Sequence, residues 1–371
     1  MKNKRPRAAA LPARAYTKPS SRKMPAAVLA ALRRVELTEV PVPEPGPGEV
    51  LIELGAVGIC GSDLHYWRHG RIADQVVKYP MRLGHEPAGV IVGLGPGVKG
   101  PPEGTPVAVE PGIPCGGCRE CLMGRANLCP NVRFLGTPPI EGAFQRYLVM
   151  PADNVAPLPE GMDAALGAAA EPVGVALHAL DLMGLRPGEH LALIGGGPVG
   201  LCIAAVALQL GARVVALAEP RPHRRRVAEQ LGVERTTGAA REEFLAAVKA
   251  GTDGVGADVV CECAGSEHGL DICVAAAARG GRVAIVGIPE VDLLPVNAHV
   301  WRKRELVVIN VRRSNRTLER ALRLLGQTDL KLRSAGVLSG TVGLGGIQDA
   351  LADLDREDSQ AVKVMVDPRL G

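Results

Sequence analysis

The fold class of this chain is decided by the stretch His190-Leu191-Ala192-Leu193-Ile194-Gly195-Gly196-Gly197-Pro198-Val199-Gly200. A short apolar run ends here in a glycine-rich turn, and an Ala/Leu-rich segment over 201–210 follows. A strand that passes through such a turn into a helix is typical of the first βα unit of a dinucleotide-binding domain. The glycines occupy the positions of G-x-G-x-x-G. The pattern predicts a pyrophosphate at the N-terminus of the helix.

Downstream of this turn, strand-like and helix-like patterns alternate. Strands are predicted over 213–218, 258–262 and 282–286, with a helix over about 224–231. Such alternation indicates βαβ units and a doubly wound parallel sheet. Glu219 ends the second strand, where an acid accepts hydrogen bonds from a ribose 2′-OH and repels a 2′-phosphate. This favours NAD over NADP.

The basic residues just beyond Glu219 leave phosphate binding open; they are Arg221, Arg224 and Arg225. The residues expected at the dinucleotide are Gly195, Gly197, Pro198, Val199, Gly200, Glu219, Arg224, Gly287 and Ile288.

Upstream of this domain, the sequence is β-rich. Short apolar runs over 50–54, 89–93 and 107–109 are separated by turn residues, which indicates a small all-β unit. The character changes near residue 165 and again near 305. We therefore divide the chain into a β-rich domain over 24–165, a parallel-sheet domain over 166–304 and a C-terminal segment over 305–371.

Composition and charge exclude several classes of protein. Hydrophobic residues make up 47% and charged residues 22% of the 371 residues, as in a globular rather than a disordered chain. No uncharged apolar stretch reaches the length of a membrane span, so we expect no membrane partner. Residues 1–23 carry eight Lys and Arg and no acid, although the net charge is +4, so the remainder carries −4. Nucleic-acid binding is therefore a hypothesis about the tail only.

Residues 1–23 are predicted to form a basic, disordered extension. An organellar transit peptide and a start at Met24 remain alternatives. We expect a cytoplasmic location, where disulfides are disfavoured and clustered thiols indicate metal binding or catalysis.

Four cysteines lie close together in the sequence, within a predicted lobe over 112–132. The four are Cys115, Cys118, Cys121 and Cys129. Four thiolates at this spacing are typical of a closed, tetrahedral zinc site. An iron–sulfur cluster also uses four cysteines and remains an alternative.

A second set of metal-ligating residue types is mixed. Cys60 opens the stretch Cys60-Gly61-Ser62-Asp63-Leu64-His65, and Gly84-His85-Glu86 follows about 20 residues later. Zinc held by three mixed ligands keeps an open position for a substrate. Glu171 lies in an apolar Ala/Leu run, where burial would be costly unless the acid were paired or bound to a metal. A helix-capping or exposed acid is the alternative.

Together these motifs resemble the zinc-dependent medium-chain dehydrogenase/reductase family, and most of all its polyol dehydrogenases. The resemblance runs from about Met24 to the C-terminus and includes Ile59–Trp67, Gly84-His85-Glu86, Thr137-Pro138-Pro139 and Glu171-Pro172. It implies a GroES-like catalytic domain, completed by the C-terminal segment, with an inserted Rossmann domain. It also implies hydride transfer from a secondary alcohol of a polyol (sorbitol, xylitol or L-iditol type) to NAD, two zinc ions per chain, and a homodimer or homotetramer.

The resemblance also implies roles for individual residues. Cys60, His85 and Glu86 match the catalytic zinc ligands, and Glu171 matches the acid that approaches this zinc directly or through water. Ser62 and His65 match the proton relay. The positions that match the substrate pocket are Tyr66, Phe134, Thr137 and Arg312, and those that match the structural zinc are Cys115, Cys118, Cys121 and Cys129.

One residue departs from the polyol pattern, which has an aromatic residue after Arg312. The residue here is Arg313. A second guanidinium favours an acidic or phosphorylated sugar alcohol, unless it points to solvent.

Two other functions are weighed against this one. The first is a different zinc dehydrogenase that acts on threonine, butanediol, a sugar acid or a simple alcohol. The second is a nucleic-acid-binding zinc protein, prompted by the cysteine cluster and the basic tail. The second leaves Glu219, the glycine turn and the Cys60/His85 pair unexplained.

Overall fold

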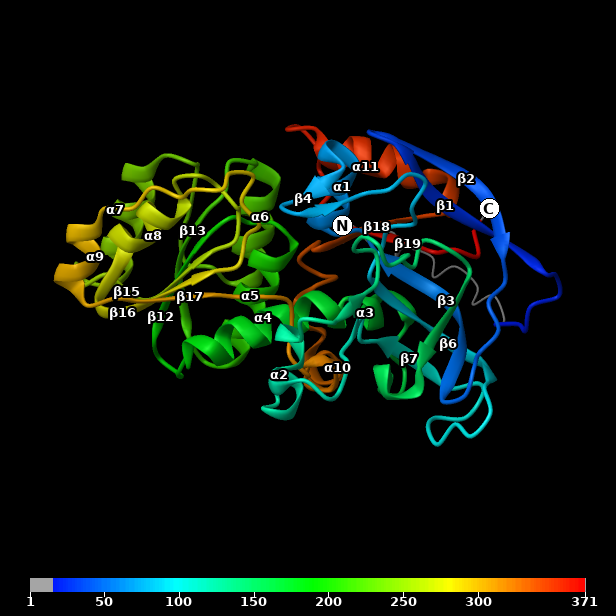
Figure 1. Ribbon diagram of the computed structural model, residues 1–371. Coiled ribbons are helices and arrows are strands. Elements are labelled where there is room, and N and C mark those ends of the chain that lie inside the picture. Colours follow the sequence, from blue (N-terminus) through cyan, green and yellow to red (C-terminus); the bar gives the residue numbers. More distant parts are fainter. Residues whose placement is uncertain (1–15, 371) are drawn as a thin grey trace, which may run out of the picture.

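The computed structural model describes residues 16–370 of the chain, in two lobes (Figure 1). One lobe, green to yellow in the figure, is built on a parallel sheet with helices on both faces. The other combines blue N-terminal strands with red C-terminal elements around a second sheet. Residues 1–15 lie outside the described part, so most of the predicted basic extension is not tested.

The parallel sheet has the strand order of a Rossmann domain. Its order is β14-β13-β12-β15-β16-β17, which is 3-2-1-4-5-6 when counted along the chain. The strands are β12 (His190–Ile194), β13 (Arg213–Ala218), β14 (Thr236–Thr237), β15 (Ala257–Glu262), β16 (Ala277–Ile285) and β17 (Val307–Asn310). Alternate residues of β12 pack on opposite faces of the sheet. Leu191 and Leu193 belong to one core cluster, and Ala192 and Ile194 belong to another. The strand reads as a continuous apolar run because both its faces are covered.

The helices of this lobe follow the predicted alternation. They are α5 (Pro198–Gln209), α6 (Pro222–Leu231), α7 (Arg241–Gly251), α8 (Gly269–Ala276) and α9 (Ala298–Arg304). One predicted boundary needs correction: β17 pairs with β16 at Arg282↔Val307, so the parallel sheet extends beyond residue 304. The sequence pattern leaves strict alternation here because β17 is an edge strand, with Val307 half exposed.

The second sheet joins segments from both ends of the chain. Its order is β11-β7-β6-β3-β19-β18, with β10 also paired to β3. The strands are β3 (Glu49–Gly58), β6 (Glu86–Leu94), β7 (Pro106–Val109), β10 (Tyr147–Pro151), β11 (Val155–Pro157), β18 (Leu338–Val342) and β19 (Lys363–Val366). The C-terminal segment therefore does return to the β-rich domain, since Met365 of β19 pairs with Gly58 of β3.

The remaining elements surround this second sheet. The strands β1 (Lys23–Ala31) and β2 (Arg34–Pro41) form a hairpin. Two shorter strand pairs are β4 (Arg71–Ile72) with β5 (Gln75–Val76) and β8 (Gly112–Ile113) with β9 (Arg133–Phe134). The helices are α1 (Gly61–His69), α2 (Arg119–Leu122), α3 (Ala164–Ala168), α10 (Leu318–Thr328) and α11 (Ile347–Asp355), with 3₁₀ turns at Ala126–Leu128, Ala152–Asn154, Asp329–Lys331 and Leu344–Gly346.

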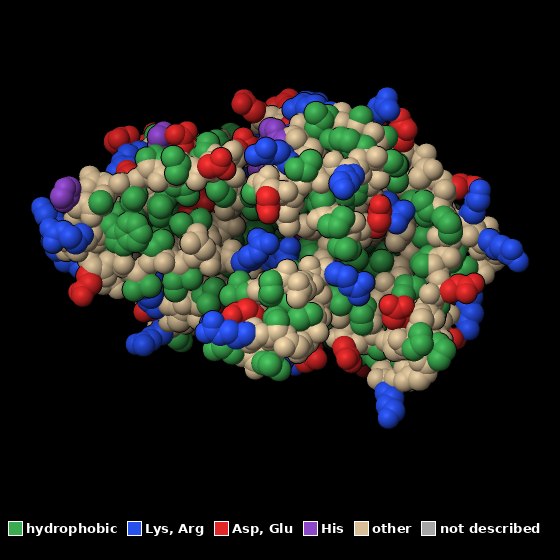
Figure 2. All heavy atoms as spheres, viewed as in Figure 1, with side chains coloured by type: hydrophobic (Ala, Val, Ile, Leu, Met, Phe, Trp, Pro, Cys, Tyr) green, Lys and Arg blue, Asp and Glu red, His purple; other side chains and the backbone are tan. Residues whose placement is uncertain are grey.

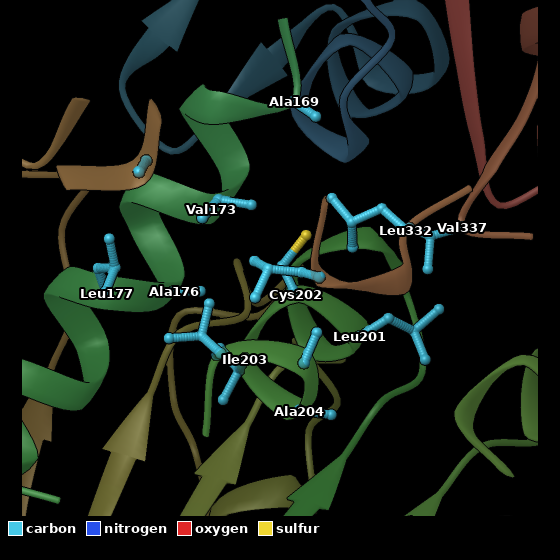
Figure 3. Packing of buried hydrophobic residues seen from close by; sticks show 14 of the residues in the cluster. Ala169, Val173, Ala176, Leu177, Leu201, Cys202, Ile203, Ala204, Leu332 and Val337 are labelled. Atoms are coloured by element: carbon cyan, nitrogen blue, oxygen red, sulfur yellow. The ribbon is translucent and has the colours of Figure 1, made fainter. Parts of the chain in front are cut away.

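The helix α4 (Ala170–Met183) connects the two lobes through a shared core. Val173 and Ala176 of α4 face residues of α5 in Figure 3, and Leu332 and Val337 from the C-terminal segment belong to the same cluster. The continuous stretch Ala164–Met183 is long and apolar enough to cross a membrane by length and composition, but 83% of its window is buried inside the protein. Its apolar character is that of a core helix.

The last residues of the predicted extension pack on the β-rich lobe. Arg369 lies over the ring of Tyr16 at 4.5 Å, and the hydroxyl of Tyr147 donates to the carbonyl of Thr17 at 3.1 Å. Residues 16–23 are therefore part of the folded body, and the prediction of disorder is wrong for them. Sequence composition missed this because these contacts come from segments far along the chain.

Candidate active site

Cys60 and His85 are held close together by a buried aspartate. Asp63, in the first turn of α1, accepts hydrogen bonds from the backbone N–H of Cys60 at 2.9 Å and of Gly84 at 3.0 Å. Its side chain is fully buried. Gly84 has a φ of +88°, and a Cβ there would lie 2.7 Å from the Phe144 ring. Sequence reasoning missed Asp63, whose position three residues after a helix start was the available signal.

Three predicted ligands form a compact donor set. One ligand atom each from Cys60, His85 and Glu86 lies within 4.8 Å of the others. The set combines a thiol, an imidazole and a carboxylate, which suits a divalent cation such as zinc. Asp63 also supports this set from outside, since its Oδ1 lies 3.8 Å from Nδ1 of His85.

A buried lysine, which sequence reasoning also missed, faces the same carboxylate. Nζ of Lys363 donates to both Glu86 oxygens, at 2.7 and 2.6 Å, and to the carbonyl of Ile59 at 3.0 Å. Burial opposes the charged amine, but the Glu86 carboxylate outweighs it and raises the pKa of Lys363. The ion pair gives the buried Glu86 side chain a partner of opposite charge in the interior.

Glu171 lies beside this set without joining it. Its carboxylate is buried at the start of α4 and is not among the three mutually close ligand atoms. Burial raises the pKa of Glu171 well above its usual range; His85 opposes this, and the charge of Glu86 adds to it. Burial likewise raises the pKa of Cys60 to about 11, with Glu86 adding to the effect. Burying several acidic groups together costs free energy unless a cation balances their charge. The site therefore fits a bound zinc ion.

The glycine turn and Glu219 form one unit at the edge of the parallel sheet. Oε2 of Glu219 accepts the backbone N–H of Gly196 at 2.8 Å, and Oε1 accepts that of Arg221 at 3.0 Å. A Cβ on Gly200 would lie 2.0 Å from the carbonyl oxygen of Gly195, so only glycine lets the helix start this close to the strand.

A cavity of about 540 Å³ opens over this turn. Of the predicted cofactor residues, all but Gly200 line it; these are Gly195, Gly197, Pro198, Val199, Glu219, Arg224, Gly287 and Ile288. Cys60 and Ser62 line its other side. Arg224 is half-buried there, and its buried Nε has no hydrogen-bond partner among the described residues. A glycine turn at a helix N-terminus together with an unpartnered guanidinium donor fits the phosphates of a dinucleotide.

His65 lies at the rim of this cavity, on the α1 face that also carries Ser62. Its Nδ1 lies 4.0 Å from Oε1 of Glu290, and Nε2 of His69 lies 3.5 Å from the same oxygen. Burial lowers the pKa of His65. The sequence had no signal for Glu290, because it reaches α1 from the loop that follows β16.

A second cavity, of about 580 Å³, contains most of the predicted substrate residues. Phe134, Thr137 and Arg312 line it. Tyr66 is buried behind the lining, where its hydroxyl donates to Oε1 of Gln75 at 3.2 Å. The Phe134 ring lies 5.6 Å from the His85 ring, so this cavity borders the Cys60/His85/Glu86 set.

The four cysteines of the lobe converge as their spacing predicts. One Sγ each from the four residues lies within 4.8 Å of the others, and those of Cys118 and Cys121 are 3.4 Å apart. Backbone N–H groups of Gly117 and Cys118 lower the pKa of Cys115 to about 6, whereas burial raises that of Cys121 to about 12. Four sulfurs in this arrangement fit a tetrahedral metal ion.

Two family models match the chain: Alcohol dehydrogenase GroES-like domain over residues 46–160, and Zinc-binding dehydrogenase over residues 198–327. The sorbitol dehydrogenase of Bacillus subtilis is 38% identical over 347 residues, which are 93% of this chain and 97% of that protein. The chain belongs to the zinc-dependent medium-chain dehydrogenases. As a member of this family it is an alcohol/polyol dehydrogenase.

Solved structures of other dehydrogenases are similar to this chain over most of its length. A zinc-binding dehydrogenase from Sinorhizobium meliloti, bound to NADP, has a TM-score of 0.85 at 30% identity and covers 93% of this chain and 99% of its own. The galactitol-1-phosphate dehydrogenase of Escherichia coli has a TM-score of 0.83 at 28% identity, with 93% and 100% covered. The predicted GroES-like and Rossmann folds are confirmed. The similarity to this family also supports zinc and a nicotinamide cofactor.

Proposed function

We propose that this dehydrogenase oxidises a secondary hydroxyl of a polyol to a ketone and reduces NAD to NADH. The observation that carries the proposal is the place of the Cys60/His85/Glu86 set between two cavities. One cavity is lined by the glycine turn, and the other by polar side chains such as Thr137 and Gln75. The similarity to a sorbitol dehydrogenase supports a polyol as the substrate.

The residues that would hold the catalytic zinc are Cys60, His85 and Glu86, with Glu171 beside them. When bound, zinc acts as a Lewis acid that lowers the pKa of the substrate hydroxyl. Asp63 positions two of the ligand loops, and Lys363 holds the Glu86 carboxylate in place. We propose a second, structural zinc ion at the four cysteines of the lobe.

We propose that Ser62 and His65 carry the proton from the hydroxyl to solvent. Both side chains line the glycine-turn cavity next to Cys60. His65 stays neutral near pH 7 because burial lowers its pKa, so its imidazole can accept a proton. Glu290 faces the outer side of His65, where it would stabilise the protonated ring.

A substrate panel tests this function. NADH formation at 340 nm would be followed with sorbitol, xylitol, L-iditol, ribitol, gluconate, threonine, butanediol and ethanol, before and after chelation and with zinc restored. We expect chelator-sensitive turnover of at least one polyol. Turnover of threonine, butanediol or ethanol without any polyol would contradict the proposed substrate class and leave the family assignment intact.

The preference for NAD is expected to depend on Glu219. In Glu219→Ala, the ratio of kcat/KM for NAD to that for NADP should fall by about 10-fold, because a carboxylate that repels a 2′-phosphate is lost and Arg221 and Arg224 remain in the cavity. Glu242→Ala, an exposed acid on α7, is the matched control. An unchanged ratio in Glu219→Ala would show that Glu219 does not select the cofactor.

The assembly and location stay predictions. A homodimer or homotetramer is expected from the family, and β17 offers an unpaired sheet edge for it among the described residues. A cytoplasmic location is proposed from the cysteine usage alone.

A further inference from the structure

We propose that the substrate carries a negatively charged group, a phosphate or a carboxylate, and that Arg313 binds this group in the 580 Å³ cavity with help from Arg312 and Arg133. This inference rests on the proposed polyol dehydrogenase function and names the substrate class more narrowly. It follows from the placement and charge of the residues that line the cavity.

Arg313 points into the protein and not to solvent. Its guanidinium lies over the Phe134 ring at 4.1 Å from the centroid, and the other neighbour of this ring is His85, at 5.6 Å. One aromatic ring therefore separates the guanidinium from a proposed zinc ligand. A polyol whose hydroxyl reaches the zinc site would place the far end of its chain near Arg313.

The positive charge of this cavity is not balanced by its lining. Three guanidiniums line it, from Arg133, Arg312 and Arg313, and none of the lining residues is an aspartate or a glutamate. Glu171 attracts Arg313 from behind the cavity, but no ion pair joins a described carboxylate to any of the three arginines. An anionic ligand would supply the missing charge.

Arg313 also has an unused hydrogen-bond donor. Its Nη1 is buried and has no partner among the described residues. A buried donor without a partner is costly, and burial together with the charge of Arg312 lowers the pKa of Arg313 to about 10. A guanidinium matches the oxygens of a phosphate or carboxylate in geometry, so either group would satisfy this donor.

The backbone around Arg313 is fixed in place. Nδ2 of Asn127 donates to the carbonyl of Arg312 at 3.0 Å, Nδ2 of Asn315 donates to that of Gly124 at 2.9 Å, and the hydroxyl of Thr317 donates to that of Gly174 at 2.8 Å. The cysteine lobe and α4 thus hold the segment from both sides. A pre-positioned guanidinium loses little freedom when an anion binds.

Three substrates with the same six-carbon skeleton test the proposal: sorbitol, sorbitol 6-phosphate and gluconate. We expect kcat/KM for at least one of the two anions to exceed that for sorbitol. In Arg313→Gln the preferred anion should lose about 10- to 100-fold in kcat/KM, mainly through KM, and the loss for sorbitol should be clearly smaller, so that the ratio of the two kcat/KM values falls. Arg313→Lys should retain part of the preference. Arg316→Gln, an exposed arginine outside the cavity, is the matched control.

The comparison of the two anions shows which charged group the substrate carries. A preference for sorbitol 6-phosphate indicates a phosphate, and a preference for gluconate indicates a carboxylate. Inorganic phosphate gives a second measurement: it should compete with sorbitol in the wild type and not in Arg313→Gln or Arg312→Gln. The proposal is overturned if sorbitol is preferred over both anions and phosphate does not compete. The polyol function itself fails only if none of the three compounds and no neutral polyol of the panel is oxidised.

Discussion

Cys60→Ser is expected to reduce polyol oxidation by about 10³-fold or more while the protein stays folded and still binds NADH. Loss of the thiolate weakens the proposed catalytic zinc site, and Lewis-acid stabilisation worth several kcal/mol is lost with it. The glycine turn and Glu219, which form the main part of the dinucleotide cavity, do not depend on this thiolate. The measurements are NADH formation at 340 nm and NADH binding by fluorescence.

The control for this experiment is Cys273→Ser. Cys273 is a buried cysteine of α8 in the Rossmann core, so the control reports the effect of a buried thiol-to-hydroxyl change alone. We expect about one zinc ion per chain in Cys60→Ser and about two in the control. Wild-type turnover in Cys60→Ser would contradict the role of Cys60, and a single zinc ion in the wild type would contradict the second site.

Lys363→Met is expected to lower the free energy of unfolding of the metal-stripped protein by about 3–5 kcal/mol. Both oxygens of the buried Glu86 carboxylate accept hydrogen bonds from Lys363, so the substitution leaves a negative charge without a partner in the interior. The loss should be smaller in the zinc-loaded protein, because the cation would also balance the Glu86 charge.

The positions of the two tryptophans allow the loss of stability to be measured in the catalytic lobe. Trp67 lies in α1 of the catalytic lobe and Trp301 in α9 of the Rossmann lobe. In a Trp301→Phe background, fluorescence during urea unfolding reports on the catalytic lobe alone. The double variant Lys363→Met/Glu86→Gln should regain part of the stability, because no buried charge is left unpaired. Equal losses in the single and double variants would show that charge balance is not the cause.

The parts of this enzyme that could be predicted from the sequence depend on residues close together along the chain. The glycine turn lies between a strand and a helix that pack against each other directly, so its spacing alone specifies its geometry. The four cysteines of the lobe fall within 15 residues, and a short loop can bring them together. The return of the C-terminal segment to the catalytic domain came from the family resemblance, and β19 shows it directly.

Predictions from composition and sequence pattern were wrong where contacts between distant segments determine the structure. The residues from Tyr16 onward are basic and lack an apolar pattern, yet they are held by Arg369 and Tyr147. The edge strand β17 fell outside the predicted Rossmann domain because only its pairing with β16 shows that it belongs there.

The charge balance of the active site was decided only by the tertiary structure. Lys363 lies 277 residues from Glu86 along the chain, and β19 brings it there by pairing with β3. From the sequence, Arg313 could equally point to solvent, and its stacking on Phe134 places it in the substrate cavity. Local spacing identifies which chemical groups a motif contains. Whether a group is buried, paired or left without a partner depends on segments that meet only when the chain has folded.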